Sequence, residues 1–199
     1  MEHLVQVVDC MSFRQVNKCL EKIYKRYDEF QGAPVHKSDT EFHVDTNVRS
    51  NTVISLNDED PIAINLGRAM GKGIEIYKER LLQAHQSYDS FPLPDTQGTT
   101  LSRESIQVLK YEAGQRYKWH TDQFPDTTHH LHNRSLSLVL YLTNNFSGGR
   151  TCLPHKCYKP RPGQALIFPS NWCFPHSAEP VERGTKIACV GWYHSHYNE

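Results

Sequence analysis

Two histidines and one aspartate are the candidate metal ligands of this chain. His120 and Asp122 lie two residues apart in KWHTD, and His176 follows in FPHSAEP. On a strand, residues two apart leave the same face with Cα atoms about 6–7 Å apart, so an imidazole nitrogen and a carboxylate oxygen can meet at one ion. Two imidazoles and one carboxylate hold non-haem Fe(II) and leave open positions on it for chemistry. An H-x-D pair or a single histidine is common without a metal, so the prediction depends on the three residues together.

A lysine adds a second feature to this candidate site. Lys186 follows His176 by ten residues, in the apolar segment KIACVGWY. Strand alternation places it on one face with Ala188, Val190 and Trp192. If that face points inward, Lys186 is a buried cation and requires an anion beside it.

A rival set of ligands is present in TCLPHKC. Cys152, His155 and Cys157 could hold zinc, but no fourth ligand stands at a standard spacing. The six cysteines are scattered along the chain. In a cytosolic chain we expect them to be reduced core residues rather than a disulfide framework.

The first hundred residues are predicted to contain a short strand and two helices. VQVVD at 5–9 is typical of a strand, and Ser12 is the predicted N-cap of a helix that runs to about residue 30. Asp60-Pro61 begins a second predicted helix, which reaches about residue 88 and which the Gly-Lys-Gly sequence at 71–73 could break or kink. Residues 31–50 are rich in turn-forming residues.

Short strands separated by Gly, Pro and Asn are predicted after residue 100. In the segment SLSLVLYL, one face carries the leucines at 136, 138, 140 and 142, which is typical of packed core. The other face ends in Tyr141 and is expected to line a cavity. Helices followed by strands predict an α+β, mainly β fold, with the N-terminal helices packed on one sheet of a β-sandwich. Residues 1–100 would be a helical support region, and residues 101–199 the core of the same domain.

Composition and charge narrow the expected partners. The formal net charge is zero, which argues against nucleic-acid binding as the main function. The N-terminus lacks the pattern of a signal peptide, and no stretch approaches the roughly 20 apolar residues that cross a bilayer. The expectation is a soluble, cytoplasmic protein with no membrane partner; the oligomeric state is not predicted.

Four segments together resemble one enzyme family: YEAGQRYKWHTD, RSLSLVLYLTNNFSGGRTCLPH, RPGQALIFP and PHSAEPVERGTKIACVGWYH. Residues 105–195 are similar to the Fe(II)/2-oxoglutarate-dependent dioxygenases, and most similar to the prolyl 4-hydroxylases among them. The resemblance implies a double-stranded β-helix, or jelly roll, with Fe(II) held by His120, Asp122 and His176. It also implies that Lys186 pairs with the far carboxylate of 2-oxoglutarate, and that Tyr111 and Tyr141 hydrogen-bond this co-substrate.

The resemblance further implies three residues near a substrate proline, namely Tyr117, Arg134 and Trp192. Core packing is the alternative for the two aromatic residues, and a solvated strand end is the alternative for Arg134. The loop QFPDTTHHLHN contains His129, His130 and His132. It could cover the site as a lid, although a solvated loop is the simpler interpretation.

The function implied by the resemblance is hydroxylation of an unactivated C–H bond with O2, as 2-oxoglutarate is converted to succinate and CO2. Asp122 favours hydroxylation over halogenation, because halogenating relatives have a small residue in its place. The expected substrate is a prolyl residue in a peptide or protein, and ascorbate is expected by resemblance alone. The alternatives are an oxygenase of a free amino acid or other small molecule, a cupin-like metal-binding protein without turnover, and a structural zinc domain.

Overall fold

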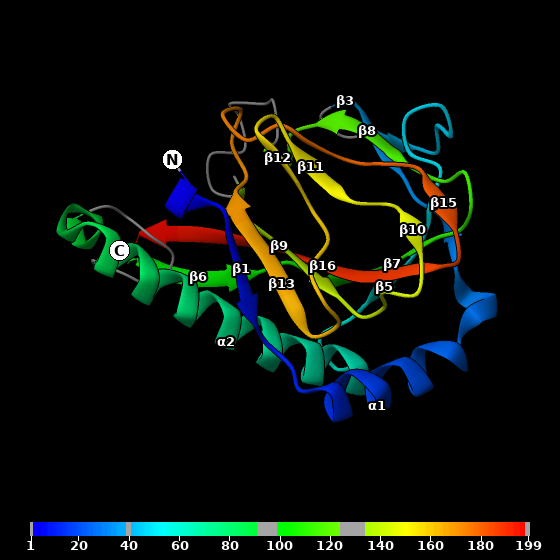
Figure 1. Cartoon of the computed structure of the whole chain (residues 1–199), viewed down its shortest axis with the longest axis horizontal. Helices are drawn as coiled ribbons and strands as arrows, with labels where there is room; N and C mark the ends of the chain where they lie inside the picture. The colour runs from blue at the N-terminus through cyan, green and yellow to red at the C-terminus, as the bar shows by residue number, and fades with distance from the viewer. Residues whose placement is uncertain (1, 39–40, 91–98, 124–133, 198–199) are drawn as a thin grey trace.

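The protein is a two-layered β-structure with two helices on one side. The computed structural model describes residues 2–38, 41–90, 99–123 and 134–197. A large sheet lies in the middle of Figure 1, with α1 and α2 below it and the smaller strands β8, β11 and β12 above it. This arrangement confirms the predicted mainly β, α+β jelly roll with helices packed on one sheet.

The first helix, α1 (Phe13–Tyr24), begins where the sequence predicts. Ser12 is its N-cap and forms a capping box with Gln15. The helix was expected to reach about residue 30 but ends at Tyr24, where the backbone changes to a 3-10 turn, η2 (Tyr27–Glu29). Arg26 leaves the helical conformation there, and its guanidinium binds both Glu29 and Asp60. The contact with Asp60 ties the end of α1 to the start of the second helix.

The second helix, α2 (Pro61–Ala84), is continuous through the Gly-Lys-Gly sequence that could have broken it. Asp60 caps it by accepting a hydrogen bond of 2.7 Å from the Ile62 N–H. A Cβ atom at Gly73 would lie 2.7 Å from Cys10 Sγ, so glycine here permits close packing of the helix on the neighbouring strand. The helix is shorter than predicted and is followed by the 3-10 turn η3 (Gln86–Ser90). No helix in the described ranges is both long enough and apolar enough to cross a membrane.

Within the described residues, eight strands form the large sheet. Its path is β1-β13-β9-β16-β7-β5-β2, with β6 paired to β16. In this order the strands are β1 (Gln6–Asp9), β13 (Gln164–Pro169), β9 (Arg134–Tyr141), β16 (Lys186–Tyr197), β7 (Ile106–Tyr111), β5 (Thr52–Leu56), β2 (Gln31–Gly32) and β6 (Thr99–Arg103). The first hundred residues therefore contribute strands to the sheet as well as helices.

The second layer is a four-stranded sheet in the order β12-β11-β14-β8. These strands are β12 (Lys156–Tyr158), β11 (Thr151–Leu153), β14 (His176–Ala178) and β8 (Tyr117–His120). Two short antiparallel pairs complete the described strands: β10 (Ser147–Gly148) with β15 (Val181–Arg183), and β3 (Val35–Ser38) with β4 (Glu41–His43). A 3-10 turn, η1 (Glu2–Leu4), precedes β1.

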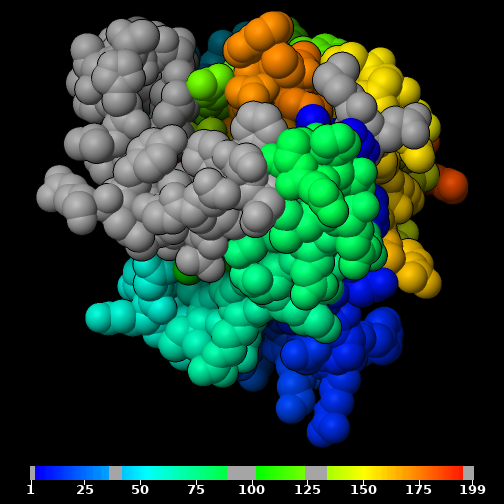
Figure 2. Space-filling model, turned by 90° about the vertical axis from the view of Figure 1, so that its left-hand side faces the viewer, coloured from blue at the N-terminus to red at the C-terminus, as the bar shows by residue number. Residues whose placement is uncertain are grey.

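Strand β9 separates the two parts of the core as its alternation predicts. Its leucines belong to the apolar cluster that includes Leu66 and Ile74 of α2. Val139 and Tyr141 belong to the cluster between the two sheets. In Figure 2, seen from the end of the molecule, the green surface of α2 lies beside the blue N-terminal residues. The helices thus cover one face of the large sheet and leave the other for the site.

One cysteine prediction is wrong. Cys152 and Cys157 face each other on the adjacent strands β11 and β12 and form a disulfide, with Cα atoms 3.9 Å apart. Their spacing in the sequence does not show that a hairpin makes them direct cross-strand neighbours. Cys10, Cys19 and Cys189 are free and buried, as expected, whereas Cys173 is free and exposed.

Candidate metal centre

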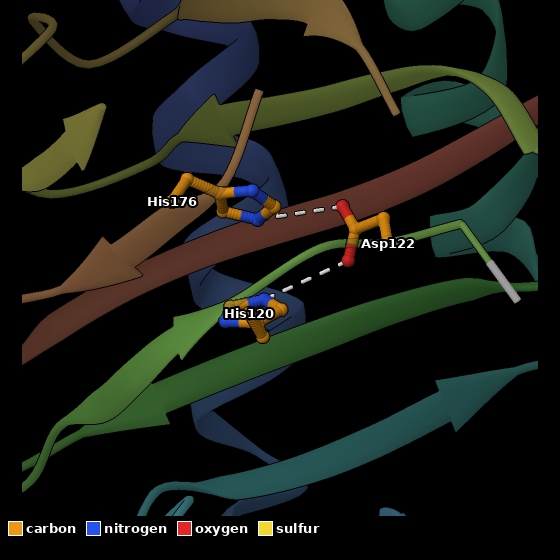
Figure 3. A group of neighbouring side chains, drawn as sticks. All are labelled: His120, Asp122 and His176. Carbon is orange, nitrogen blue, oxygen red and sulfur yellow. Dashed lines mark ion pairs between the residues drawn. The ribbon is translucent and has the colours of Figure 1, made fainter. Parts of the chain in front are cut away.

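The three candidate ligands converge from two neighbouring strands. His120 is the last residue of β8 and His176 is the first of β14, and the two are register partners in the antiparallel pair. Asp122 lies just beyond the end of β8 rather than on the strand, and its carboxylate points between the two rings (Figure 3). The distance is 3.6 Å from His120 Nε2 to Asp122 Oδ1 and 3.4 Å from His176 Nε2 to Asp122 Oδ2.

Hydrogen bonds outside the triad orient the ligands. His120 Nδ1 lies 2.8 Å from the Lys118 carbonyl oxygen, which favours a proton on Nδ1 and leaves Nε2 free to bind a metal. The Ser137 hydroxyl donates to Asp122 Oδ2 at 2.6 Å. The Tyr117 ring stacks on His120 with centroids 3.5 Å apart, which further restricts the imidazole.

The protonation states suit metal binding. Burial lowers the pKa of His120 to about 3, and the charge of His176 adds to this effect. Burial opposes ionisation of Asp122, but His176, His120 and the hydrogen bond from Ser137 together hold the pKa of this carboxyl below its usual range. The site therefore offers a neutral imidazole and a carboxylate at neutral pH, which are the forms that bind cations.

The donor set fits Fe(II). The ligand atoms of the triad lie within 4.8 Å of one another, close enough to share one ion through bonds of about 2 Å. Nitrogen and oxygen donors that leave positions open are typical of non-haem iron, whereas structural zinc sites are usually closed by four ligands.

The triad opens into a cavity of about 570 Å3 between the two sheets. Its walls include every predicted site residue except Tyr141. The lining residues from that set are Tyr111, Tyr117, His120, Asp122, Arg134, His176, Lys186 and Trp192. Strand alternation correctly placed Lys186, Ala188, Val190 and Trp192 on this inward face.

Lys186 is a buried cation at one wall of the cavity. Its side chain is 2% exposed, and Nζ donates a hydrogen bond of 2.8 Å to the carbonyl oxygen of Gly149. Among the described residues it forms no ion pair. Burial lowers the pKa of Lys186 to about 7; the charge of Glu179 raises it and that of Lys159 lowers it. An anion that entered the cavity could supply the missing partner.

Two tyrosines flank this lysine. Lys186 Nζ lies 5.0 Å from the ring centroid of Tyr111 and 5.1 Å from that of Tyr141. Burial raises the pKa of Tyr111 to about 12, so its phenol stays protonated and can donate a hydrogen bond. Tyr141 was expected to line the cavity but does not: it is fully buried, and its hydroxyl is hydrogen-bonded to Thr151 Oγ1, which does line the cavity.

The three predicted substrate residues surround the metal centre. Arg134 is not a solvated strand end, because it forms two 2.7 Å hydrogen bonds with Glu104 and its Cζ lies 3.7 Å from the Trp192 ring centroid. Trp192 is buried, yet its indole N–H has no acceptor among the described residues. This N–H is itself shielded from solvent, so it is an unsatisfied donor behind the surface of the cavity. The histidine-rich loop with His129, His130 and His132, for which a lid and a solvated loop were both considered, lies outside the described residues.

Arg49 is a cavity residue that the sequence did not reveal. It is 6% exposed, and its guanidinium donates to the neutral oxygens of Asn51 and Pro34 at 3.0 and 3.1 Å. Its Cζ lies 4.9 Å from the Tyr117 ring centroid. Arg49 lies in the turn-rich stretch, where no periodic pattern marks a residue as inward-facing.

The rival zinc set does not assemble. Cys152 and Cys157 are bonded to each other in a disulfide, whereas zinc binding requires free thiolates. The His155 ring instead lies 3.3 Å from the Tyr158 hydroxyl. The third metal-binding group near the two cysteines is Glu179, which is paired with Arg150.

Comparison with known proteins agrees with this geometry. Residues 106–194 match the family model of the 2OG-Fe(II) oxygenase superfamily. A putative prolyl 4-hydroxylase of Acanthamoeba polyphaga mimivirus is 33% identical over 107 residues, which are 45% of this chain and 44% of that protein. A probable prolyl 4-hydroxylase of Arabidopsis thaliana is 33% identical over 121 residues, covering 46% of this chain and 42% of the relative. The chain thus spans less than half the length of these curated relatives.

Solved structures share the whole fold. The viral collagen prolyl hydroxylase of Paramecium Bursaria Chlorella virus-1, in a 2OG complex, has a TM-score of 0.66 at 17% identity and covers 96% of this chain and 95% of its own. A Trichoplax adhaerens prolyl hydroxylase, in complex with a peptide fragment of the hypoxia inducible factor oxygen degradation domain, has a TM-score of 0.66 at 15% identity over 96% of this chain and 83% of its own.

These findings confirm the resemblance in two steps. The match over residues 106–194, just under half of the chain, supports a 2OG-Fe(II) oxygenase, and the solved structures share its fold. The relatives named prolyl 4-hydroxylases, each matched over less than half of its length, support a prolyl 4-hydroxylase-like member of that superfamily.

Proposed function

We propose that this protein is an Fe(II)- and 2-oxoglutarate-dependent dioxygenase that hydroxylates a prolyl residue in a peptide or protein. The observation that carries the proposal is the shared cavity. A three-ligand metal centre and a buried lysine without an anionic partner among the described residues face the same space. A metal-binding protein without turnover needs the first feature but not the second.

The residues of the cavity fall into two groups with different functions. His120, Asp122 and His176 would hold Fe(II), and Lys186 with Tyr111 would bind the far carboxylate of 2-oxoglutarate. When bound, iron and 2-oxoglutarate together supply, with O2, the oxidant for an unactivated C–H bond. The chain itself keeps the ligands in their binding forms, orients the co-substrate and surrounds the reaction with apolar walls. Ascorbate would serve only to keep the iron reduced.

A prolyl substrate is supported by the names of the relatives and by the walls beside the iron site. Tyr117 and Trp192 offer flat apolar surfaces of the kind on which a pyrrolidine ring packs. Arg134, which is fixed by its ion pair with Glu104, stacks on the Trp192 indole and holds it in place.

The test is coupled turnover on a panel of proline-containing peptides, with succinate and hydroxylated peptide measured together. The wild-type protein should form them in a one-to-one ratio, and His120→Ala should form neither. Lys186→Ala should raise the KM for 2-oxoglutarate by about tenfold or more, since a buried charge-assisted contact is lost. Lys156→Ala, at an exposed lysine outside the cavity, should leave that KM unchanged.

Succinate formation without a hydroxylated peptide across the panel would redirect the substrate assignment to free amino acids or other small molecules. An equal KM for 2-oxoglutarate in Lys186→Ala and Lys156→Ala would remove Lys186 from the co-substrate site.

A further inference from the structure

Two exposed aromatic side chains lie at the edge of the cavity. Trp172 is 77% exposed and Phe42 is 60% exposed, and both line the cavity that contains the metal centre. The other exposed large apolar residues in the described ranges are not part of its lining. Trp119, for example, is 57% exposed and adjoins a metal ligand, yet it lies outside the cavity.

Trp172 is presented by an ordered turn between β13 and β14. The N–H groups of Cys173 and Phe174 donate to the side-chain and backbone oxygens of Asn171, each at 3.0 Å. Ser170, at the base of the turn, is buried and bonded through its backbone to Ser135 and Gln123. The connection is the orange segment at the top of Figure 1. The backbone is thus fixed, while the indole itself is left to solvent.

Trp172 precedes the candidate ligand His176 by four residues and lines the same cavity, although most of its side chain is exposed. A free amino acid is small enough to lie entirely within a 570 Å3 cavity and has no need of an aromatic residue at the edge. An extended peptide that places one residue at the iron must leave the cavity along its edge. Aromatic-lined grooves bind the polyproline II helix, because its preformed rings stack on them at low entropic cost.

We infer that Trp172 holds a residue flanking the target in a proline-rich peptide, with Phe42 of the β3–β4 hairpin as a second aromatic wall. The inference rests on the proposed function and deepens it, since it makes the substrate a chain in the polyproline II conformation rather than a free amino acid. Trp172 is a positioning residue for this reaction, and tryptophan is among the residues that most often dominate binding at interfaces.

The test compares two blocked probes, acetyl-decaproline-amide and acetyl-proline-methylamide, with hydroxylation and succinate measured in parallel. Trp172→Ala should raise the KM for the decaproline probe by about tenfold or more, with kcat within about twofold of wild type. The KM for 2-oxoglutarate and turnover of the single-residue probe should not change. Trp119→Ala is the matched control and should behave as wild type, and Trp172→Phe should retain most of the affinity.

The wild-type protein could hydroxylate decaproline while Trp172→Ala and Trp119→Ala show the same KM for this probe. That result would overturn the inference and leave the proposed function standing. Equal catalytic efficiency of the wild-type protein on the two probes would also overturn it, because flanking residues would then contribute nothing. A wild-type protein that binds Fe(II) and 2-oxoglutarate but hydroxylates neither probe would overturn the inference together with the prolyl assignment.

Discussion

At the scale of single residues, the site contains a buried amine, that of Lys186, which forms no ion pair among the described residues. Lys186 is buried beside two tyrosines and a backbone carbonyl, and Glu179, the acid whose charge raises its pKa, is already paired with Arg150. Burial brings the pKa of Lys186 down to about 7, so an empty cavity holds a lysine that is only partly protonated at neutral pH. A carboxylate requires the protonated form, so co-substrate binding should be coupled to proton uptake.

The affinity for 2-oxoglutarate should therefore depend on pH through Lys186. Below about pH 7 the lysine is charged and the affinity is constant; above it the dissociation constant should rise, approaching about tenfold per pH unit. Glu179, Lys159, Tyr111 and Tyr141 are the other titratable groups that face or influence it. Anaerobic calorimetry from about pH 6 to pH 9, in buffers of different ionisation enthalpy, measures both the affinity and the protons taken up.

Lys186→Arg is the control for this prediction, since a guanidinium stays protonated throughout the range. The variant should bind with an affinity that does not vary with pH, whatever its absolute value. A wild-type affinity that is equally flat would mean that Lys186 remains fully charged in the empty cavity.

At the scale of elements, the hairpin β11–β12 supports the part of the cavity that contains Lys186. Thr151 on β11 bonds the Tyr141 hydroxyl, and Gly149 just before β11 accepts the hydrogen bond from Lys186. The backbone of Gly149 has a φ of +60°, a conformation that glycine adopts at little cost. The disulfide Cys152–Cys157 joins β12 to this strand and so limits its movement.

Removal of the disulfide should destabilise the protein moderately. The bridge closes a short loop, for which the chain-entropy estimate is about 2 kcal/mol. Cys157→Ser should lower the free energy of unfolding in urea by about this amount, and a dithiol reductant should have a similar effect on the wild-type protein but none on the variant. Cys173→Ser, at an exposed free cysteine, is the matched control. An unchanged urea midpoint in both Cys157→Ser and reduced wild-type protein would contradict the prediction.

At the scale of the whole molecule, periodic segments were predictable and irregular ones were not. The alternation in β9 correctly separated the leucine face from the cavity face, and Ser12 and Asp60 correctly marked the starts of both helices. The ends of both helices were overestimated, because the 3-10 turns that follow them are not visible as a pattern of apolar residues. Strand β5 was missed, although its β-branched Thr-Val-Ile run favours a strand.

The site residues also differ in how far the sequence could predict them. The metal triad was predictable because its residue types are chemically distinctive, although Asp122 lies beyond the strand on which it was expected. Strand alternation correctly placed Lys186 on the inward face. Arg49, Trp172 and the disulfide were not, because each depends on irregular connections or hairpin register that bring distant segments together. Their positions follow from the tertiary structure rather than from local sequence.

The measurement that tests the central claim most directly is an anaerobic titration of the Fe(II)-loaded protein with 2-oxoglutarate, followed by visible absorption. Chelation of iron by the co-substrate gives a weak charge-transfer band, and detection requires no knowledge of the substrate. We predict a saturable band in the wild-type protein, none in His120→Ala, and a much weaker affinity in Lys186→Ala than in Lys156→Ala. A folded, iron-loaded protein that shows no band at any concentration of 2-oxoglutarate would contradict the assignment as a 2-oxoglutarate-dependent enzyme.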